Sequence, residues 1–247
     1  MIMRLAVLLL VLALAACGAP VTTASPVPAG TGTPMATDAP VAAPAPASTG
    51  PDAPEPVSVC VPAPARQLNV RLLRQVAYDY DPLNSPEELV AEVPLVVAGT
   101  VEDFLPGRVA EEGIPGDRTH YVLMPVRVSD RFKGQAGDVV HVQFFQGGIW
   151  RNETPVHSVA DFRRAIPAGT RVLVFVHPHS PQGAVIKDRA GLPAGTPVYS
   201  AHPQGVLLGR GLDVIGGMEE IDPRSRWADP CGLDGIAARL RAAGFTG

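Results

Sequence analysis

The sequence predicts a mainly β fold: a small antiparallel barrel with short helices at its margins, preceded by a disordered linker rich in Pro, Ala and Thr. Three observations predict it. Short runs of β-branched and aromatic residues recur from residue 95 onwards, and several of them alternate apolar with polar positions. Turns containing Gly and Pro separate these runs. Before them, the chain holds ten prolines between residues 18 and 57 and no aromatic residue ahead of Tyr78.

The first element expected in the folded domain is a short helix that begins after Ser85. Ser85 can cap this helix, Pro86 suits its first turn, and Glu88 stands at the position that completes a capping box. Pro94 ends the helix. The apolar run Leu95–Val101 that follows is expected to form a buried strand.

Two alternating runs predict the next strands. In Tyr121–Val128 every second residue is Val or Met, so these side chains share one face of a strand. Pro125 lies inside this run, and the strand is therefore expected to be an edge or to bulge there. A turn-rich connection leads to Val139–Phe145, in which His141 and Gln143 occupy the polar face.

The C-terminal part of the domain is expected to add three strands and one helix. Arg171–Val176 is the clearest strand of the chain because of its β-branched and aromatic content. Weaker strands are expected around Val198–Ser200 and Val206–Leu208. A final helix is expected over Ile236–Ala243, with Asp234 as its N-cap.

Five or six antiparallel strands with short terminal helices favour a small closed or partly open barrel. The order of several short segments also resembles bacterial exported domains with an OB-like barrel, similar to the TIMP/netrin architecture. These segments are Val97–Val101, Val126–Val128, Phe132–Gly134, Pro167–Phe175 and Gln204–Val206. The resemblance implies an OB-like fold. It does not imply inhibition of metalloproteases, because the Cys-rich N-terminus of true TIMPs is absent from this sequence.

The N-terminal sequence predicts where in the cell the protein is located. Arg4 precedes an apolar run over residues 5–16, which is shorter than the roughly 20 residues of a membrane-spanning helix and suits a secretory signal. Leu14–Cys17, with the sequence LAAC, resembles the bacterial lipobox, which implies that residues 1–16 are a signal peptide and that Cys17 carries the lipid. The expected location is the bacterial cell envelope, outside the cytoplasm and anchored to a membrane. The alternative is a plain signal peptide with an incidental Cys17.

Residues 17–59 are expected to form a disordered tether. Their only charges are Asp38, Asp52 and Glu55, and the many prolines favour extended, polyproline-like conformations. Residues 60–247 then form a single β-rich domain, and a chain of this length can build one core.

The two remaining cysteines lie at opposite ends of that domain. Disulfides persist in exported proteins, so Cys60 and Cys231 are expected to pair and to fasten the start of the domain to its C-terminal segment. The alternative is two separate thiols. Neither cysteine lies in a motif that indicates a catalytic thiol.

The net charge restricts the class of macromolecule that the protein is expected to bind. The formal net charge of −4 argues against binding to nucleic acid, which requires a concentrated basic face. No second long apolar run is present, so the expected contact with the membrane is the lipid on Cys17. A protein or a polymer of the envelope is the other expected partner.

Histidines offer one candidate metal site. His177 and His179 flank Pro178 after the clearest strand, and residues two apart on a strand face the same way. His157 and His202 could complete the ligand set if the loops converge. The alternative is a proline-rich loop at the rim of the barrel, because no Cys or carboxylate stands at ligand spacing nearby.

No motif for catalysis or for a cofactor is found. His157, Ser158 and Asp161 are adjacent in sequence, but a catalytic triad is a spatial arrangement. The nucleophile and metalloprotease motifs G-x-S-x-G, S-x-x-K and H-E-x-x-H do not occur. We therefore predict no catalytic residue and no cofactor, and leave enzymatic activity open.

Two short segments combine Arg with Trp, residues favoured at binding hot spots. These are Trp150 with Arg151, and Arg224 and Arg226 with Trp227. If the two segments meet at one end of the barrel, they could form a contact surface. The alternative is that each Trp packs into the barrel while an Arg lies outside it.

The sequence as a whole predicts a lipid-anchored, extracytoplasmic domain that binds a ligand or has a structural role. Its ligand does not follow from any residue. The alternative function is a metal-binding or hydrolytic envelope protein that uses the histidines.

Overall fold

The computed structural model describes residues 60, 67–113, 115–147, 154–180 and 183–247. The expected signal peptide, Cys17 and most of the tether lie outside the described residues, as do Trp150 and Arg151. In the described part, no helix is both long enough and apolar enough to span a bilayer.

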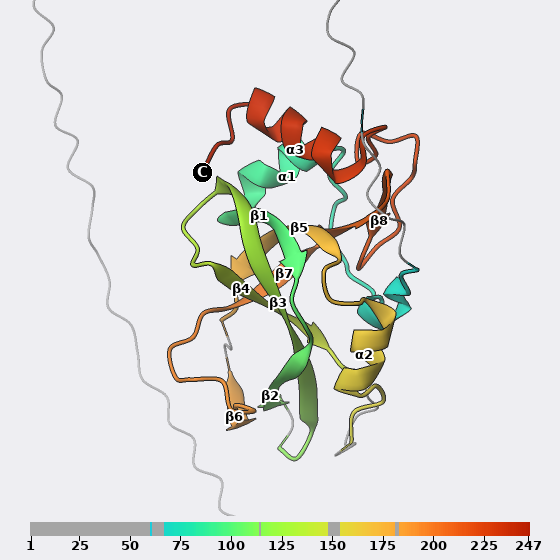
Figure 1. Cartoon of the computed structure of the whole chain (residues 1–247). Coiled ribbons are helices and arrows are strands. Elements are labelled where there is room, and N and C mark those ends of the chain that lie inside the picture. Colours follow the sequence, from blue (N-terminus) through green and yellow to red (C-terminus); the bar gives the residue numbers. More distant parts are fainter. Residues whose placement is uncertain (1–59, 61–66, 114, 148–153, 181–182) are drawn as a thin grey trace, which may run out of the picture. The chain divides into compact units, whose positions relative to one another are not determined.

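The described part is mainly β, with three short α-helices (Figure 1). In chain order the elements are the 3-10 helix η1 (Val70–Leu73), α1 (Pro86–Glu92), β1 (Leu95–Val101), β2 (Leu105–Glu112), β3 (Arg118–Lys133), β4 (Val139–Phe145), α2 (Val159–Ala165), β5 (Arg171–Pro178), β6 (Ala184–Asp188), β7 (Val198–Arg210), β8 (Asp213–Gly216) and α3 (Gly232–Ala242).

Five of the strands close a small barrel. Going around it, β1 pairs with β5, β5 with β7, β7 with β4, β4 with β3, and β3 with β1 again. The barrel confirms the predicted fold class, but it is mixed, because β4 and β7 run parallel. A closed ring with an odd number of strands cannot alternate direction at every step, so a fully antiparallel barrel of five strands was not possible.

Three strands that the sequence did not predict extend the sheet beyond the barrel. β2 pairs with β3 and with β6, so β2 and β6 form a ribbon beside the barrel, at the bottom of Figure 1. β2 belongs to the connection from β1 to β3, and β6 belongs to the connection from β5 to β7. β8 pairs with the end of β7.

Two hydrophobic clusters stabilise this arrangement. The first fills the barrel, with Val122, Met124, Val142 and Val174 fully buried, and reaches Phe162 of α2. The second joins Leu173 and Phe175 of β5 to α1 and α3, which lie side by side in Figure 1. β5 therefore buries both of its faces, which is why its sequence is continuously apolar.

Ser85 caps α1 as predicted, because its Oγ accepts the Glu88 N–H at 3.3 Å. The reciprocal half of the capping box differs from the prediction. The Glu88 carboxylate accepts the backbone N–H of Asn84, one residue before the cap, at 3.0 Å.

Pro125 lies in the interior of the sheet and not at an edge. β3 pairs with β1 from Val126 onwards and with β2 up to Leu123, so Pro125 stands where β3 changes partner. The Pro125 carbonyl accepts the Glu102 N–H at 2.9 Å on that side. The backbone nitrogen of Pro125 therefore lies between the part of β3 that pairs with β1 and the part that pairs with β2. Because neither strand offers a ladder hydrogen bond there, the absence of an N–H costs none.

The two weak strands predicted around residues 198–200 and 206–208 are one continuous strand, β7. Its register against β5 shifts between Val174 and Val176. Gly205 lies at this irregularity, where a Cβ atom would come within 2.6 Å of the Phe175 carbonyl oxygen. The bend makes β7 look like two strands in the sequence.

The prediction for the last helix was wrong at its start. α3 begins at Gly232, after Cys231, and not at Ile236. The Asp229 side chain stabilises the turn before this earlier start, because its Oδ1 accepts the Cys231 N–H at 2.9 Å. Asp234 lies in the first turn and forms an ion pair with Arg171 of β5.

α2 was not predicted. Ser158 and Asp161 form a complete capping box at its start, so the serine considered as a nucleophile serves as a helix cap.

Candidate ligand-binding site

A cavity of about 340 Å³ lies between the barrel and the β2–β6 ribbon. We call it the arginine cavity. It is lined by Arg108, Leu123, Gln143, Pro178, His179, Ile186, Arg189, Leu192, Pro193, Gly195, Thr196, Pro197, Val198 and Tyr199. These residues come from β2 to β7 and from the connection between β6 and β7, so only the assembled sheet brings them together.

Gln143 is held at the wall of this cavity by the alternation of β4. Its neighbours Val142 and Phe144 point into the barrel, so Gln143 points away from it. The strand lies between β3 and β7, and the pairing with β7 sets Gln143 opposite Ser200. Gln143 is only 7% exposed, which is low for a polar residue outside the barrel core.

Gln143, His179 and Ser200 form a polar cluster. The Gln143 Nε2 lies 2.8 Å from the His179 Nδ1, and the Ser200 Oγ lies 2.8 Å from the same nitrogen. If Nδ1 accepts from the amide, the proton of the neutral imidazole is on Nε2.

Two atoms of the cluster are buried without a hydrogen-bond partner among the described residues: the Gln143 Oε1 and the His179 Nε2. As assigned, they are one acceptor and one donor. Rotation of the amide together with the other imidazole tautomer exchanges the two roles. In either state the cluster holds one unpaired donor and one unpaired acceptor.

Arg108 of β2 adds a charge to the cavity wall. Its guanidinium lies over the Tyr121 ring, 4.8 Å from the ring centroid. Its side chain is 13% exposed, and Nη2 lies 3.5 Å from the Glu112 Oε1. Nε and Nη2 are buried and make no hydrogen bond to the described residues. Their shared edge is the one that binds carboxylates in bidentate fashion.

The Tyr121 hydroxyl donates a hydrogen bond to the Glu112 Oε1 at 2.8 Å. Burial and the neighbouring Glu112 raise the pKa of Tyr121 to about 12, so the phenol keeps its proton at neutral pH. The Glu112 carboxylate thus contacts both the Tyr121 hydroxyl and the Arg108 Nη2, but it makes no hydrogen bond to the Arg108 Nε.

Arg108 and Arg189 are the charged groups among the described lining residues of the arginine cavity, and no carboxylate is included. Glu112, which does not line the cavity, forms an ion pair with Arg108. Burial, and secondarily the nearby Arg108, lower the pKa of His179, so its imidazole is neutral at pH 7. The cavity therefore presents positive charge and neutral hydrogen-bonding groups within walls that are mostly apolar.

A second cavity of about 430 Å³ shares Gln143 and His179 with the first. Tyr78, Glu112 and Tyr121 are among its other lining residues. The Gln143–His179 pair thus separates two neighbouring hollows along the β3–β4 face.

The histidines considered as metal ligands do not gather. Among the described residues, no group of three or more His, Cys, Asp or Glu side chains is close enough to hold a metal ion. His179 contacts Gln143, His177 is exposed, and His202 packs edge-on against Tyr80 with ring centroids 5.2 Å apart. His157 begins the segment that leads into α2, and its backbone N–H donates to Gln146.

Trp227 lies in the second hydrophobic cluster and is 5% exposed. Its indole N–H donates to the Leu83 carbonyl at 2.9 Å, and its ring packs on Phe175 at 6.3 Å between centroids. The indole therefore fastens the segment before α1 to the outer face of β5. Its proposed partners in a contact surface, Trp150 and Arg151, lie outside the described residues.

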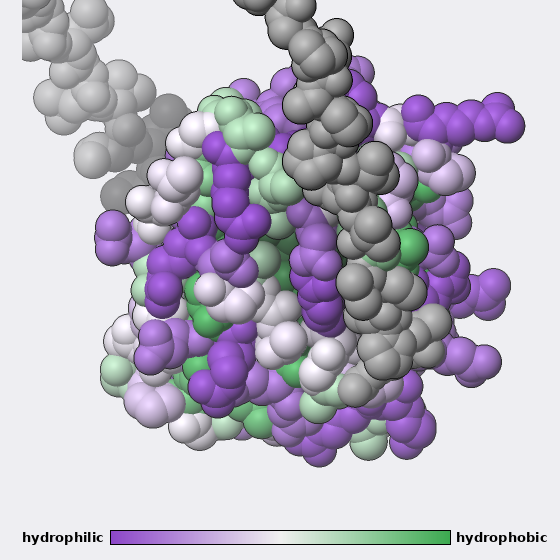
Figure 2. Space-filling model, turned by 45° about the horizontal axis from the view of Figure 1, so that its top comes forward, coloured by the Kyte–Doolittle hydropathy of each residue, from purple (hydrophilic) through white to green (hydrophobic). Residues whose placement is uncertain are grey.

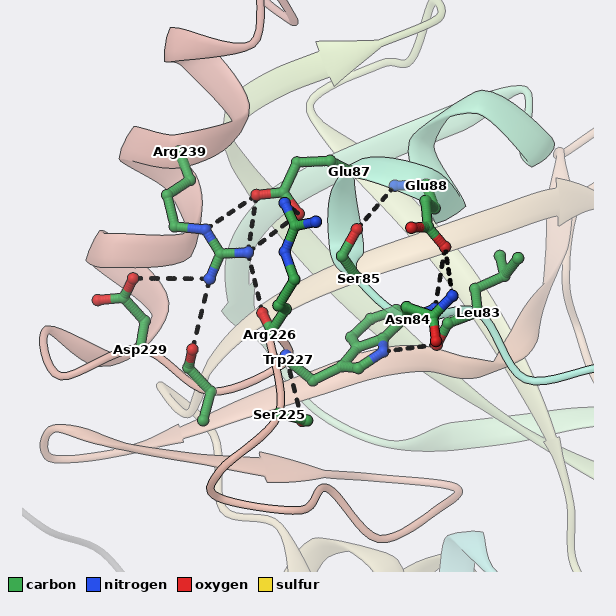
Figure 3. A network of polar contacts seen from close by, with 11 residues as sticks. Leu83, Asn84, Ser85, Glu87, Glu88, Ser225, Arg226, Trp227, Asp229 and Arg239 are labelled. Carbon is green, nitrogen blue, oxygen red and sulfur yellow. Dashed lines mark hydrogen bonds and ion pairs between the residues drawn. The ribbon is translucent and has the colours of Figure 1, made fainter.

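Arg226 belongs to a network that joins α1 to α3 (Figure 3). The Arg239 guanidinium binds both carboxylate oxygens of Glu87 at 2.9 Å and also the Arg226 carbonyl at 2.9 Å. The Arg226 side chain approaches Glu87 at 3.9 Å, and Arg224 is exposed. The backbone of this segment thus has a structural role between the two helices.

Cys60 and Cys231 lie at disulfide distance, with their Cα atoms 5.3 Å apart.

Sequence reasoning did not single out the arginine cavity. The sequence placed Gln143 on the polar face of its strand, and this was the available indication of the cavity. The strand β2, which carries Arg108, was not predicted.

Comparisons with protein-family models, curated proteins and solved structures find no match for this chain.

Proposed function

We propose that this protein is a lipid-anchored, extracytoplasmic binding domain and that its ligand occupies the arginine cavity. The observation that carries the proposal is the cavity itself, with mostly apolar walls and with Arg108, Gln143 and His179 among its lining residues. These three residues also hold buried polar atoms that make no hydrogen bond to the described residues, and such exceptions are rare in native proteins. The volume of about 340 Å³ lies at the lower end of the range of small-molecule sites.

The topology supports this position for a ligand. The five-stranded mixed barrel is compatible with an OB-like fold, in which ligands contact the face of the second and third strands and the loops after the first and fourth. In this barrel those parts correspond to β3 and β4 and to the connections that contain β2 and β6. Residues of all four elements line the arginine cavity.

The surface offers less support for a large protein interface. On the face drawn in Figure 2, polar side chains surround small apolar areas. The exposed large apolar residues of the described part are Val76, Tyr78, Val156, Val185 and Leu212. Val76 and Tyr78 belong to one segment, and the other three come from separate segments. A ligand enclosed in a cavity fits such a surface better than a partner that needs a wide apolar patch.

The lipid anchor is supported by the LAAC sequence at Leu14–Cys17. Two acyl chains on Cys17 would give stable attachment to a membrane, and the proline-rich residues 17–59 would hold the domain away from it. The same location would oxidise the neighbouring Cys60 and Cys231 to a disulfide.

The proposal is tested with the full-length chain, purified in mild detergent and immobilised. We expect it to retain specific small molecules from an envelope extract, identified by mass spectrometry. Thr196→Trp, which places a large ring in the arginine cavity, should abolish retention. Val156→Trp is the matched control, because Val156 is 55% exposed and does not line the cavity. Retention of the same molecules by all three proteins would refute the proposed site.

A further inference from the structure

We infer that the bend of β7 is a proton-sensitive joint: protonation of His202 breaks the hydrogen bond that holds the bend and loosens the attachment of the segment before α1. The joint consists of His202, Gln204 and Leu83. None of these three residues lines the arginine cavity, so the joint is a separate feature of the domain.

The His202 imidazole holds the bend in its neutral form. Its Nδ1 accepts the backbone N–H of Gln204 at 3.3 Å. An Nδ1 that accepts a hydrogen bond carries no proton, so the proton of the neutral ring is on Nε2. Protonation of the ring places a second proton on Nδ1, which then meets the Gln204 N–H as donor against donor. A backbone N–H cannot rotate to exchange its role, as a side-chain amide can, so this hydrogen bond is lost.

The bend leaves the imidazole little room to adjust. Gly205 is the next residue, and a Cβ atom there would lie 3.0 Å from the His202 Cβ and 2.6 Å from the Phe175 carbonyl oxygen. On another side the ring packs edge-on against Tyr80, with centroids 5.2 Å apart. We therefore expect the conflict between the two donors to be relieved by opening of the bend.

Gln204 connects the bend to the segment before α1. Its side-chain amide makes two hydrogen bonds to the backbone of Leu83, because Oε1 accepts the Leu83 N–H at 2.8 Å and Nε2 donates to the Leu83 carbonyl at 3.1 Å. The same carbonyl accepts the Trp227 indole N–H at 2.9 Å (Figure 3). A displaced Gln204 therefore loosens Leu83 and the chain that leads into α1.

The groups that face His202 come from four parts of the domain: His177 of β5, Glu92 of α1, Glu219 after β8 and Tyr80 before α1. Burial, and secondarily the charge of His177, lower the pKa of His202 below its ordinary value of 6.5. The two carboxylates oppose this shift but do not cancel it. Glu219 is also engaged elsewhere, because it accepts the Tyr80 hydroxyl.

The lowered pKa of His202 gives the direction of the response. In the opened joint the imidazole is hydrated and its pKa returns to the ordinary 6.5, so the opened form binds the proton more readily. The stability of the closed joint is therefore fully present above pH 6.5. It is lost as the pH falls from 6.5 through the lower pKa of the closed form.

The first test is an NMR titration of the histidine ring protons in the full-length chain, purified in mild detergent. Cross-relaxation with the Tyr80 ring identifies the His202 signal without a variant. We expect a midpoint below pH 6.5, and a higher midpoint in His177→Asn, which removes the neighbouring positive charge. A midpoint at or above pH 6.5 in the unmodified protein would overturn the inference.

The second test measures the opening by hydrogen exchange. Between about pH 7.5 and about pH 5.5, protection of the Leu83 amide should fall at least about threefold after correction for the intrinsic exchange rate. Protection of the Val174 amide, in the middle of β5, should fall less. His202→Asn keeps an acceptor for the N–H two residues on but does not titrate, so its extra fall at Leu83 should disappear.

His141→Asn is the matched control. Burial lowers the pKa of His141 as well, but this residue lies on β4 and is not part of the joint. The variant should therefore respond to pH as the unmodified protein does.

Two exchange results would overturn the inference. An equal extra fall at Leu83 in His202→Asn and in the unmodified protein would assign the response to another group. Equal falls at Leu83 and Val174 in the unmodified protein would show that the whole domain opens. If His202→Asn does not fold, the titration and the comparison of Leu83 with Val174 still decide, because both use the unmodified chain.

Discussion

At the scale of single residues, the unusual feature of this domain is polar side chains that are buried but incompletely bonded. Gln143 bonds to His179 through Nε2, but its Oε1 is buried and bonds to none of the described residues. An unpaired buried acceptor costs stability. Trp227 illustrates the opposite case, because its ring and its N–H are both satisfied within the domain.

Gln143→Leu should therefore separate stability from binding. We expect the free energy of unfolding to stay within about 1 kcal/mol of the unmodified protein, because removal of an unpaired buried acceptor offsets the lost hydrogen bond to His179. Retention of small molecules from an envelope extract should fall in the same variant. Urea unfolding and mass spectrometry of the retained molecules provide the two measurements. A loss of more than about 2 kcal/mol in the unfolding experiment would show that the amide is a structural group.

Glu87→Gln should make the protein less stable in a way that depends on pH. Burial favours protonated Glu87, but hydrogen bonds from its own backbone and from Arg239 outweigh it and hold the pKa below the ordinary value of 4.5. A depressed pKa in the folded state contributes stability above the unfolded value, and this stability is lost as the pH falls through the folded value. We expect a loss of about 1–3 kcal/mol at neutral pH.

The difference between Glu87→Gln and the unmodified protein should shrink in acid, as the unmodified carboxylate also becomes neutral. Urea unfolding at a series of pH values below neutrality measures it. A difference that stays constant down to strongly acidic pH would contradict the assigned cause.

At the scale of elements, capping explains where the helices begin. Ser85 is fully buried and caps α1, and Ser158 completes a capping box with Asp161 at the start of α2. α3 has no side-chain cap at Cys231 and depends instead on the Asp229 turn and on the apolar contacts of Ile236 and Leu240.

Ser85→Ala should lower the free energy of unfolding by about 1–2 kcal/mol, because the Glu88 N–H loses its side-chain acceptor at the start of α1. Ser129→Ala is the control, since Ser129 lies on β3 in an exposed hydrogen bond. Chemical denaturation of both variants gives the comparison. Equal stability of the two would mean that the cap contributes nothing.

At the scale of the whole molecule, the barrel and its outer helices are fastened at their ends. Cys60 and Cys231 are 171 residues apart in sequence and lie at disulfide distance. In the chain-entropy model, a bond that closes so long a loop restricts the unfolded chain strongly.

The double variant Cys60→Ser with Cys231→Ser should lose about 3–5 kcal/mol of unfolding free energy relative to the oxidised protein. Reduction of the unmodified protein should produce the same loss, while the double variant should not respond to reductant. Intact mass under non-reducing conditions checks the bond directly. Two free thiols in protein isolated from its native envelope would contradict the proposed pairing.

The strands that were predicted well are those whose own residues form an uninterrupted apolar or alternating run. β1 and β4 have the predicted bounds, because each is a short run dominated by apolar residues. β7 appeared as two strands, because its bend at Gly205 interrupts the apolar run. β2, β6 and β8 were missed, because charged residues such as Glu111 and Lys187 interrupt their patterns.

The sequence by itself determined most of the barrel strands, the inward faces of β3 and β4, the cap of α1 and the lipobox-like N-terminus, because all of these depend on neighbours along the chain. Tertiary structure alone decided the parallel closure between β4 and β7 and the meeting of Arg108, Gln143 and His179. Arg108 and Gln143 lie on different strands of one sheet, and His179 directly follows a third strand. Their proximity follows from strand pairing, and no local pattern in the sequence records which strands pair.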